Sequence, residues 1–258
     1  MNRKVLLILV DGMRSDSLAA CGHPFASEFA CDGYSNLDAQ TVFPCITLPC
    51  HMSLFHSVIP QRHGILTNTY VPQVRPVLGL VDVLNQNRIN SAFLYNWEEL
   101  RDLSRPGSLA YSYLLAQNKY ENTDWLLTKQ AIQLIHESSP EFVFLYLGET
   151  DEVGHSQQWM SEAYLAAVHN AWHCIETIVK ALPEDYTTII TADHGGHLFM
   201  HGTLESCDMT IPIMISKTAR MYPTDKLLTA EITDIAPTIT AILGVVAASE
   251  WTGKSLLY

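Results

Sequence analysis

The sequence predicts a layered α/β domain whose sheet is largely parallel and covered by helices. Two observations carry this prediction. Short apolar runs recur along the chain without polar alternation, which is typical of strands buried on both faces. Stretches of helical period lie between these runs, and strands that alternate with helices form layered α/β domains. With 258 residues, 48% of them apolar, the chain is long enough for a substantial core.

Five short runs are the expected strands. They are VLLILV at 5–10, SAFLY at 91–95, FVFLYL at 142–147, TTII at 187–190 and IPIMIS at 211–216. Helical periodicity is clearest at 161–182, where apolar residues return every three or four positions. A second helix is expected at about 124–137. A third is expected at 234–244, opened by Asp234 and closed by Gly244.

The stretch from about 65 to 125 differs from the rest of the chain, because it holds several proline and asparagine residues and its periodicity is weaker. We expect part of it to form a small cap over the active edge of the sheet. Repeats and Pro/Ser-rich linkers are absent from the sequence. Residues 1–258 are therefore expected to form a single catalytic domain.

Charge and cysteine content restrict the partners and the compartment. The net charge of −12 disfavours binding to nucleic acid polymers or to anionic membranes, since both need basic patches. The six cysteines show no CxxC pair, which is typical of thiols in a reducing compartment. The apolar run from Val5 to Val10 is too short for a signal sequence or a membrane span. We therefore expect a cytoplasmic protein, and its composition is compatible with a homo-oligomer.

Three of the expected strands run into an aspartate. The first leads to Asp11, another to Asp151 followed by His155, and a third to Asp193 and His194. A single aspartate after a strand is more often a helix cap or a turn residue. Three at the ligand-binding edge of an α/β sheet would repel one another unless cations bridged them. This pattern indicates a metal site.

The segment TADHGGHLFMHG, residues 191–202, adds His201 to these donors. The resulting six side chains could fill two sites of three ligands each and leave positions open for substrate, which is the mark of a catalytic centre. Histidine combined with carboxylate favours two zinc ions per chain, with manganese or iron as alternatives.

Thr47 is the candidate nucleophile. It stands just ahead of a helix expected to start near Pro49, since proline is favoured in the first helical turn. Backbone N–H groups at such a helix start favour an anion such as a phosphate oxygen. Taken alone, Thr47 is more often a capping or turn hydroxyl, and only the surrounding pattern points to catalysis. A metal contact can stabilise the threonine alkoxide.

Several motifs together resemble the alkaline phosphatase superfamily, and most closely its type I phosphodiesterase/nucleotide pyrophosphatase branch. They are LILVDGMRSD, TLPCHMSLFHSVIPQRHGI, ETDEVGH and TADHGGH…HGT…MTIPIMI, and the closing TDIAPTITAILGV…WTGKSLL is also similar. The likeness is weakest between about 70 and 140. It implies a three-layer sandwich, in which a central mixed and mostly parallel sheet has helices on both faces.

The resemblance also implies how the donors divide. One ion is held by Asp11, Asp193 and His194, with the Thr47 oxygen also in contact. The other is held by the remaining donors, which are Asp151, His155 and His201. Three carboxylates and one alkoxide balance the charge of two divalent ions, and such a pair can orient an in-line displacement. The implied reaction forms a phospho-threonine at Thr47, which water then hydrolyses.

Four further residues are candidates for substrate binding: Arg14, His51, Asn68 and Tyr70. Arg14 could reach a phosphate, although a surface salt bridge is slightly favoured. The asparagine that follows the nucleophile closely in many nucleotide-cleaving relatives is missing, because Leu48 to His51 occupy these positions. His51 either replaces this asparagine or has a structural role, and the sequence favours neither alternative over the other. His63 is expected to stabilise a turn near Gly64.

The expected function is hydrolysis of small-molecule phosphate esters, most of all diesters. Alternatives that use the same site are a phosphomonoesterase, a phosphotransferase or mutase, and a phosphonate hydrolase. A sulfatase is disfavoured, since that branch matures a cysteine or serine within a C/S-x-P-x-R pattern. A non-catalytic binding protein is disfavoured because every expected ligand and the nucleophile are present.

Overall fold

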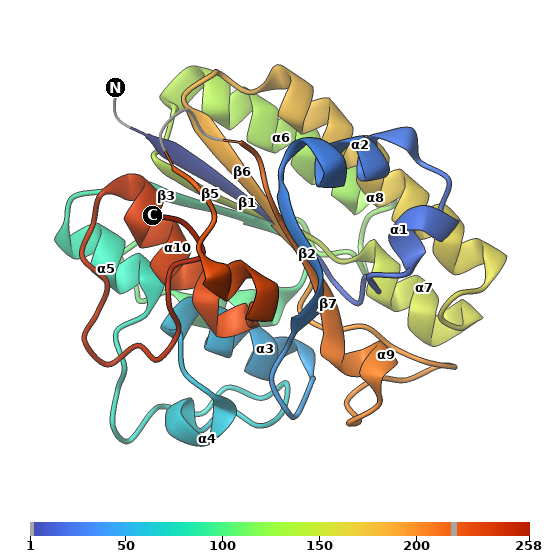
Figure 1. Ribbon diagram of the computed structural model, residues 1–258, viewed down its shortest axis with the longest axis horizontal. Coiled ribbons are helices and arrows are strands. Elements are labelled where there is room, and N and C mark those ends of the chain that lie inside the picture. The colour runs from blue at the N-terminus through green and yellow to red at the C-terminus, as the bar shows by residue number, and fades with distance from the viewer. Residues whose placement is uncertain (1–2, 218–220) are drawn as a thin grey trace.

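The computed structural model describes residues 3–217 and 221–258 and contains one seven-stranded sheet (Figure 1). The strand order is β2-β7-β6-β1-β5-β3-β4. The strands are β1 (Lys4–Val10), β2 (Tyr34–Gln40), β3 (Ser91–Tyr95), β4 (Tyr111–Leu114), β5 (Phe142–Leu147), β6 (Tyr186–Thr191) and β7 (Thr210–Ile215). Strand β7 is antiparallel to both of its neighbours, β6 and β2, and the other pairs are parallel. The sheet is therefore mixed and mostly parallel, as expected.

Helices cover both faces of the sheet and complete the expected three layers (Figure 1). One face carries α2 (Pro24–Asp32), α6 (Thr123–Ser138) and α8 (Glu162–Ala181), with α1 (Ser17–Ala20) and α7 (Glu149–Gln157) near its end. The other face carries α3 (Thr47–His56), α5 (Leu80–Gln86) and α10 (Ile235–Leu243), with α4 (Pro60–His63) beyond them. Short elements complete the fold: α9 (Ser206–Met209), η1 (Glu98–Leu103), η2 (Asp225–Thr229) and η3 (Ile232–Asp234).

The central strand β1 sets the position of the candidate site. All six residues from Val5 to Val10 are fully buried, because β5 and β6 flank the strand and helices cover both of its faces. In the parallel register Leu9 lies opposite Thr191, and Val10 lies opposite Leu147. The residues that follow these strands therefore leave the sheet side by side at one edge.

All five predicted strands and the expected helices are present, and two edge strands were missed. Strand β2 has the sequence YSNLDAQ and is mostly half-buried or exposed, and β4 has the sequence YSYL with alternating exposure. Each has a neighbour on one side only, so neither needs the apolar run that marks a strand in the middle of the sheet.

The stretch from 65 to 125 contributes β3 and β4 to the sheet and α5 to a covering layer. A cap drawn from this stretch stays a prediction, confined to its irregular parts such as residues 66–79. Across the two described ranges, no helix combines the length and the apolar character needed to cross a membrane. All six cysteines are free thiols.

His63 closes the turn that ends α4. Its Nδ1 accepts a hydrogen bond from the Ile65 N–H at 3.1 Å, so its Nε2 carries the hydrogen and faces the Ser53 hydroxyl at 3.0 Å. Burial, together with the nearby His56, lowers the pKa of His63 to about 3. The folded protein therefore contains the neutral imidazole, whose two nitrogens are both used.

This turn predicts an acid-dependent loss of stability. The usual pKa of histidine is 6.5. Below that pH the imidazole of residue 63 is protonated in the unfolded chain but stays neutral in the folded chain. Stability therefore falls as pH drops from 6.5 toward 3. In urea unfolding, the difference in free energy between wild type and His63→Gln should shrink by about 1 kcal/mol per pH unit between roughly pH 6 and pH 4.

The control for this measurement is His136→Gln, which changes an exposed histidine of α6. Its difference from wild type should stay constant over the same range. A pH-independent difference for His63→Gln would contradict the assignment of a neutral, buried imidazole.

Candidate active site

The ends of β1 and β6 bring the first group of donors together. One ligand atom each of Asp11, Asp193 and His194 lies within 4.8 Å of the other two, and all three residues are buried. The His194 Nε2 lies 3.3 Å from Asp11 Oδ1 and 3.4 Å from Asp193 Oδ2. The family resemblance implies that these three side chains hold one ion, and the structure gathers them in one place.

A second group lies beside the first. Asp151, in the first turn of α7, has its Oδ2 3.5 Å from His155 Nε2 and its Oδ1 3.9 Å from His201 Nε2. The ring of His201 stacks on that of His194, with centroids 3.8 Å apart, and these two histidines also share a group of donors with Asp151. All six predicted donors therefore converge, and His194 lies between the two groups.

Backbone carbonyls orient the three histidines. A carbonyl oxygen only accepts hydrogen bonds, so each Nδ1 carries the hydrogen and each Nε2 keeps a lone pair directed at the other donors. The bonds run from His194 to Gly195 O (2.8 Å), from His201 to Cys45 O (2.9 Å) and from His155 to Phe199 O (2.9 Å). A side chain at position 195 would overlap the Cys207 carbonyl, with its Cβ only 1.9 Å away, so glycine is required there.

Each carboxylate of the first group has one oxygen held and one free. Asp193 Oδ1 accepts from the N–H groups of Gly12 (3.1 Å) and His194 (3.0 Å), and Asp11 Oδ2 accepts from the Tyr146 hydroxyl. Asp193 Oδ2 and Asp11 Oδ1 are buried without a hydrogen-bond partner, as is Asp151 Oδ1. Unpaired buried carboxylate oxygens beside histidine lone pairs fit divalent metal ions.

The pKa values of these side chains show that the ionised carboxylates are unfavourable in this buried site when no cation is bound. Burial, together with the charge of Asp151, raises the pKa of Asp193 to about 8 even though the Gly12 N–H opposes the shift. Burial and the charges of Asp193 and Asp151 raise the pKa of Asp11 as well. Burial lowers the pKa of His194 to about 3. Positive charge at the site would restore the ionised carboxylates, and neutral imidazole is the form that binds metal.

Thr47 is the first residue of α3, and its hydroxyl faces the first group of donors. The Oγ1 lies 3.3 Å from His194 Nε2, and the residue is 4% exposed. Ile46, and not Thr47, occupies the N-cap position, and no side chain caps the helix there. The Thr47 hydroxyl therefore does not cap the helix, which was the alternative that the sequence left open.

His51 lies one turn further along α3 and is completely buried. Its Nδ1 donates to the Thr47 carbonyl at 2.8 Å and lies 3.6 Å from Asp193 Oδ2, and its ring packs against Tyr146. This enclosed imidazole fixes the Thr47 carbonyl and packs beside the Asp193 carboxylate. The structure thus favours the structural alternative, and substrate contact through His51 has no support from its position.

The other three candidates lie in different surroundings. Arg14 pairs with Asp16 and donates to the Gly196 carbonyl at 3.0 Å, so its guanidinium braces the loop that follows β6. Asn68 is exposed, and its Oδ1 accepts from the Leu48 N–H at 2.9 Å, next to the nucleophile. Tyr70 is 38% exposed. Substrate binding by these residues stays a prediction.

Two supports of the site were missed at the sequence level. Tyr146 stands in the apolar run of β5, and only its hydroxyl distinguishes it from the neighbouring core residues. Asp208 is fully buried and organises the loop that carries His201, because it binds the Thr203 N–H (2.9 Å), the Thr203 hydroxyl (2.8 Å) and His197 Nδ1 (2.7 Å). The polar segment ESCD gave no periodic signal that marked this residue.

A third missed residue, Asp124 of α6, positions the helix that carries Asp151. Its carboxylate accepts from the Gly148 N–H at 3.0 Å and from the Asn96 amide at 2.7 Å, at the N-terminus of α7. Burial, with the charge of Glu149 nearby, raises its pKa to about 8. In sequence it reads as an ordinary first-turn acid of a helix, and only the fold places it at the start of another helix.

Two family models match the chain. The model of the Metalloenzyme superfamily matches residues 106–247, which is more than half of the chain. The model of type I phosphodiesterase / nucleotide pyrophosphatase matches residues 5–87. The two matches together include all of the gathered donors and Thr47.

Curated relatives come from two kinds of enzyme. The 2,3-bisphosphoglycerate-independent phosphoglycerate mutase of Clostridium botulinum is 31% identical over 160 residues, which cover 59% of this chain and 29% of that protein. Ectonucleotide pyrophosphatase/phosphodiesterase family member 1 of Rattus norvegicus is 23% identical over 252 residues, which cover 85% of this chain and 28% of that protein. The chain spans less than a third of the length of either relative.

Solved structures share the fold over nearly the whole chain. Murine ectonucleotide pyrophosphatase / phosphodiesterase 5 aligns with a TM-score of 0.78 and 15% identity, covering 99% of this chain and 100% of that one. A 2-O GAG sulfatase aligns with a TM-score of 0.76 and 15% identity, covering 99% and 73%. With a family model over more than half of its length and this fold, the chain belongs to the Metalloenzyme superfamily, within the alkaline phosphatase superfamily.

Proposed function

We propose that the chain is a hydrolase of phosphate esters, most active on diesters, that uses two divalent metal ions of the zinc type and Thr47 as nucleophile. The observation that carries this proposal is the position of the Thr47 hydroxyl. It lies at the start of a helix, 3.3 Å from the Nε2 of a histidine that belongs to both groups of metal donors. A hydroxyl held there meets a phosphoryl group at a helix N-terminus.

The chain's own residues would act in two steps. In the first, Thr47 Oγ1 forms a bond to phosphorus while the bond from phosphorus to the leaving oxygen breaks, and the alcohol departs. In the second, water attacks phosphorus and releases the threonine, so that the enzyme is regenerated. The Thr47 carbonyl, bonded to His51, keeps the first turn of α3 fixed during both steps.

Asp11, Asp193 and His194 would hold one ion, and Asp151, His155 and His201 the other. When bound, the two ions supply the positive charge that favours the threonine alkoxide and polarises the phosphoryl oxygens. Asn68 supports the same region, because its bond to the Leu48 N–H fixes its side chain beside the nucleophile. Its free amide N–H groups are suited to a phosphate oxygen.

The preference for diesters rests on charge and on relatives. A diester carries one negative charge and a monoester nearly two, so a monoester demands more positive groups around phosphorus. Arg14, the cation nearest to the site in sequence, is already paired with Asp16. The murine phosphodiesterase 5 structure, whose whole chain aligns here, contains AMP in an inactive threonine-to-alanine variant. A nucleotide ester is therefore a reasonable first substrate to assay.

A phosphotransferase or mutase is the second candidate, and the 31% identity to phosphoglycerate mutases over part of the chain favours it. The same phospho-threonine would then pass its phosphoryl group to an alcohol and not to water. Product analysis in the presence of glycerol or a sugar alcohol separates the two, because only a transferase forms the new ester in preference to inorganic phosphate.

We further propose that the substrate is a small molecule and that the chain acts in a reducing compartment such as the cytoplasm. Support comes from the net charge of −12 and from the six unpaired thiols.

The first prediction of this proposal concerns the nucleophile. Thr47→Ala should lower turnover by about a thousandfold or more, as losses of nucleophiles generally do, while the fold and most of the metal affinity are kept. Thr47→Ser should keep part of the activity, since serine supplies the same hydroxyl. The measurements are kcat with a nitrophenyl phosphodiester and metal content by elemental analysis.

The matched control is Thr41→Ala, a buried threonine whose hydroxyl bonds only to Cys50 among the described residues. It should keep kcat within a few-fold of wild type. Turnover in Thr47→Ala that matches this control would remove Thr47 from the mechanism.

The second prediction concerns the metal ions. After exhaustive dialysis the six donors at the strand ends should retain two divalent ions, and a chelator should remove both of these ions and the activity together. Asp193→Asn should retain fewer ions, because it loses the charge of a buried ligand. Asp185→Asn is the control, since Asp185 lies at the opposite end of β6 and pairs with Lys4 at 2.9 Å. Equal metal content in both variants, or a wild type that binds no metal, would refute the site.

The third prediction concerns substrate class. A nitrophenyl diester should be cleaved with a higher kcat/KM than a matched nitrophenyl monoester. A monoester that wins by tenfold or more, equivalent to about 1.4 kcal/mol of transition-state preference, would replace the diesterase with a monoesterase. Phosphonate and sulfate esters assayed alongside would show how far the site discriminates at the reacting atom.

A further inference from the structure

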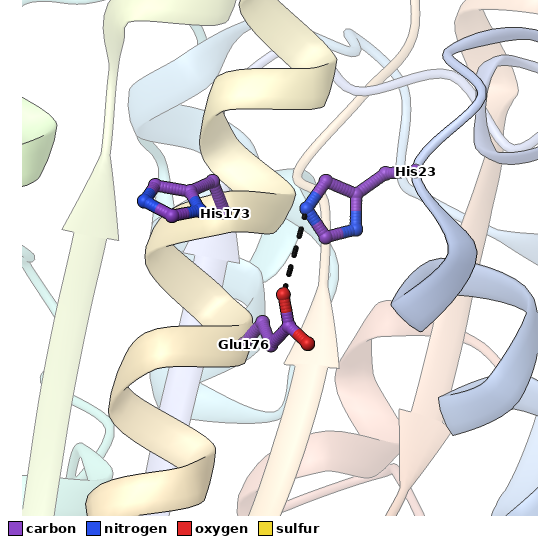
Figure 2. Close-up of side chains that lie close together, drawn as sticks. All are labelled: His23, His173 and Glu176. Atoms are coloured by element: carbon purple, nitrogen blue, oxygen red, sulfur yellow. Dashed lines mark ion pairs between the residues drawn. The ribbon is translucent and has the colours of Figure 1, made fainter.

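A second cluster of metal-type donors lies between α8 and the segment just before α2 (Figure 2). His173 and Glu176 project from α8, and His23 reaches them from the segment just before α2. One ligand atom of each residue lies within 4.8 Å of those of the other two. None of the three belongs to the groups at the strand ends.

His23 is the residue whose surroundings need explanation. It is 7% exposed, and no hydrogen bond joins either of its ring nitrogens to another described residue. Its Nδ1 is buried without a partner, and its Nε2 faces Glu176 Oε2 at 3.8 Å, beyond hydrogen-bond distance. The Nε2 is the nitrogen that faces Glu176, and it is therefore available to an ion. The unpartnered Nδ1 lies on the other side of the ring and does not point at the cluster.

The spacing suits a small divalent ion. A tetrahedral zinc ion with bonds of about 2.0–2.1 Å holds its ligand atoms roughly 3.4 Å apart. The separation of 3.8 Å between His23 and Glu176 is already close to this value, and the limit of 4.8 Å for the set requires only side-chain adjustment. Two imidazoles and one carboxylate form a donor set that zinc and its neighbours prefer.

We propose that His23, His173 and Glu176 form a separate binding site for a divalent transition-metal ion of the zinc type.

The surrounding contacts leave the required atoms available. Lys180 bonds to Glu176 Oε1 at 2.5 Å and so leaves Oε2 turned toward His23. The ring of His173 stacks on Trp125, with centroids 5.4 Å apart, which restrains its orientation. Burial, with the nearby His169, lowers the pKa of His23 and keeps its imidazole in the neutral form that metals bind.

His169 lies next to the cluster, although it is not one of the three residues whose ligand atoms lie within 4.8 Å of one another. It lies one turn before His173 on α8, and its ring centroid is 4.7 Å from that of His23. Its Nδ1 donates to the Cys21 carbonyl at 3.0 Å, so its Nε2 keeps a lone pair. An ion at this site would join the segment before α2 to α8, two elements that are distant in sequence. The site is therefore structural in kind, and its loss should leave catalysis intact.

Equilibrium dialysis with zinc alone tests the proposal in the full chain. At saturating zinc, wild type should bind one ion more than His173→Gln, and Glu176→Gln should weaken that additional ion by tenfold or more. His173 is exposed, so its replacement should not impair folding. His136→Gln, an exposed histidine of α6, is the control and should bind as many ions as wild type.

A spectroscopic readout identifies the site directly. With the strand-end site saturated by zinc, titrated Cu²⁺ or Ni²⁺ should quench the fluorescence of Trp125 through the stacked His173. The quenching should be markedly weaker in both Trp125→Phe and His173→Gln than in wild type. Equal zinc stoichiometry and affinity in wild type and His173→Gln would overturn the proposal. Because each comparison is between variants that keep the strand-end donors, failure of the proposed hydrolase leaves this test readable.

Discussion

The repulsion among three carboxylates at the ends of β1, β5 and β6 is the constraint on which the rest of the structure depends. Parallel register places Asp11 and Asp193 together, the first turn of α7 brings Asp151 beside them, and burial raises the pKa of each carboxyl group. Few folded chains can contain such a group unless cations balance it. One free oxygen on each carboxylate, together with three imidazole lone pairs, provides the coordination that would make the group stable.

Hydrogen bonds from surrounding polar groups fix the positions of the donor side chains. Tyr146 and the Gly12 N–H each hold one carboxylate oxygen, while His51 supports Asp193 and the first turn of α3. Two more distant buried acids fix the segments that carry the donors. Asp124 fixes the start of α7, and Asp208 fixes the loop that follows β6. The donors therefore depend on a network that extends through both helical layers and not on the sheet alone.

The donors were predictable from the sequence, and their supports were not. Buried parallel strands have a distinctive apolar pattern, so an aspartate within two residues of the end of such a strand can be assigned to the ligand-binding edge, as for Asp11 and Asp193. Tyr146 and Asp124 lie inside regular elements, where a polar atom gains its role only from a partner distant in sequence. The edge strands β2 and β4 were missed for a related reason, because solvent exposure removes the pattern.

The use of carbonyl oxygens to orient the histidines affects how this site can evolve. Every residue type has a backbone carbonyl, so the bonds to Cys45 and Phe199 do not depend on which side chain these positions carry. Phe199 is 54% exposed and lies in the same loop as His201. Mutation at this position can reshape the rim of the site while the donor geometry is conserved. The orientation of His155 is therefore independent of which side chain position 199 carries.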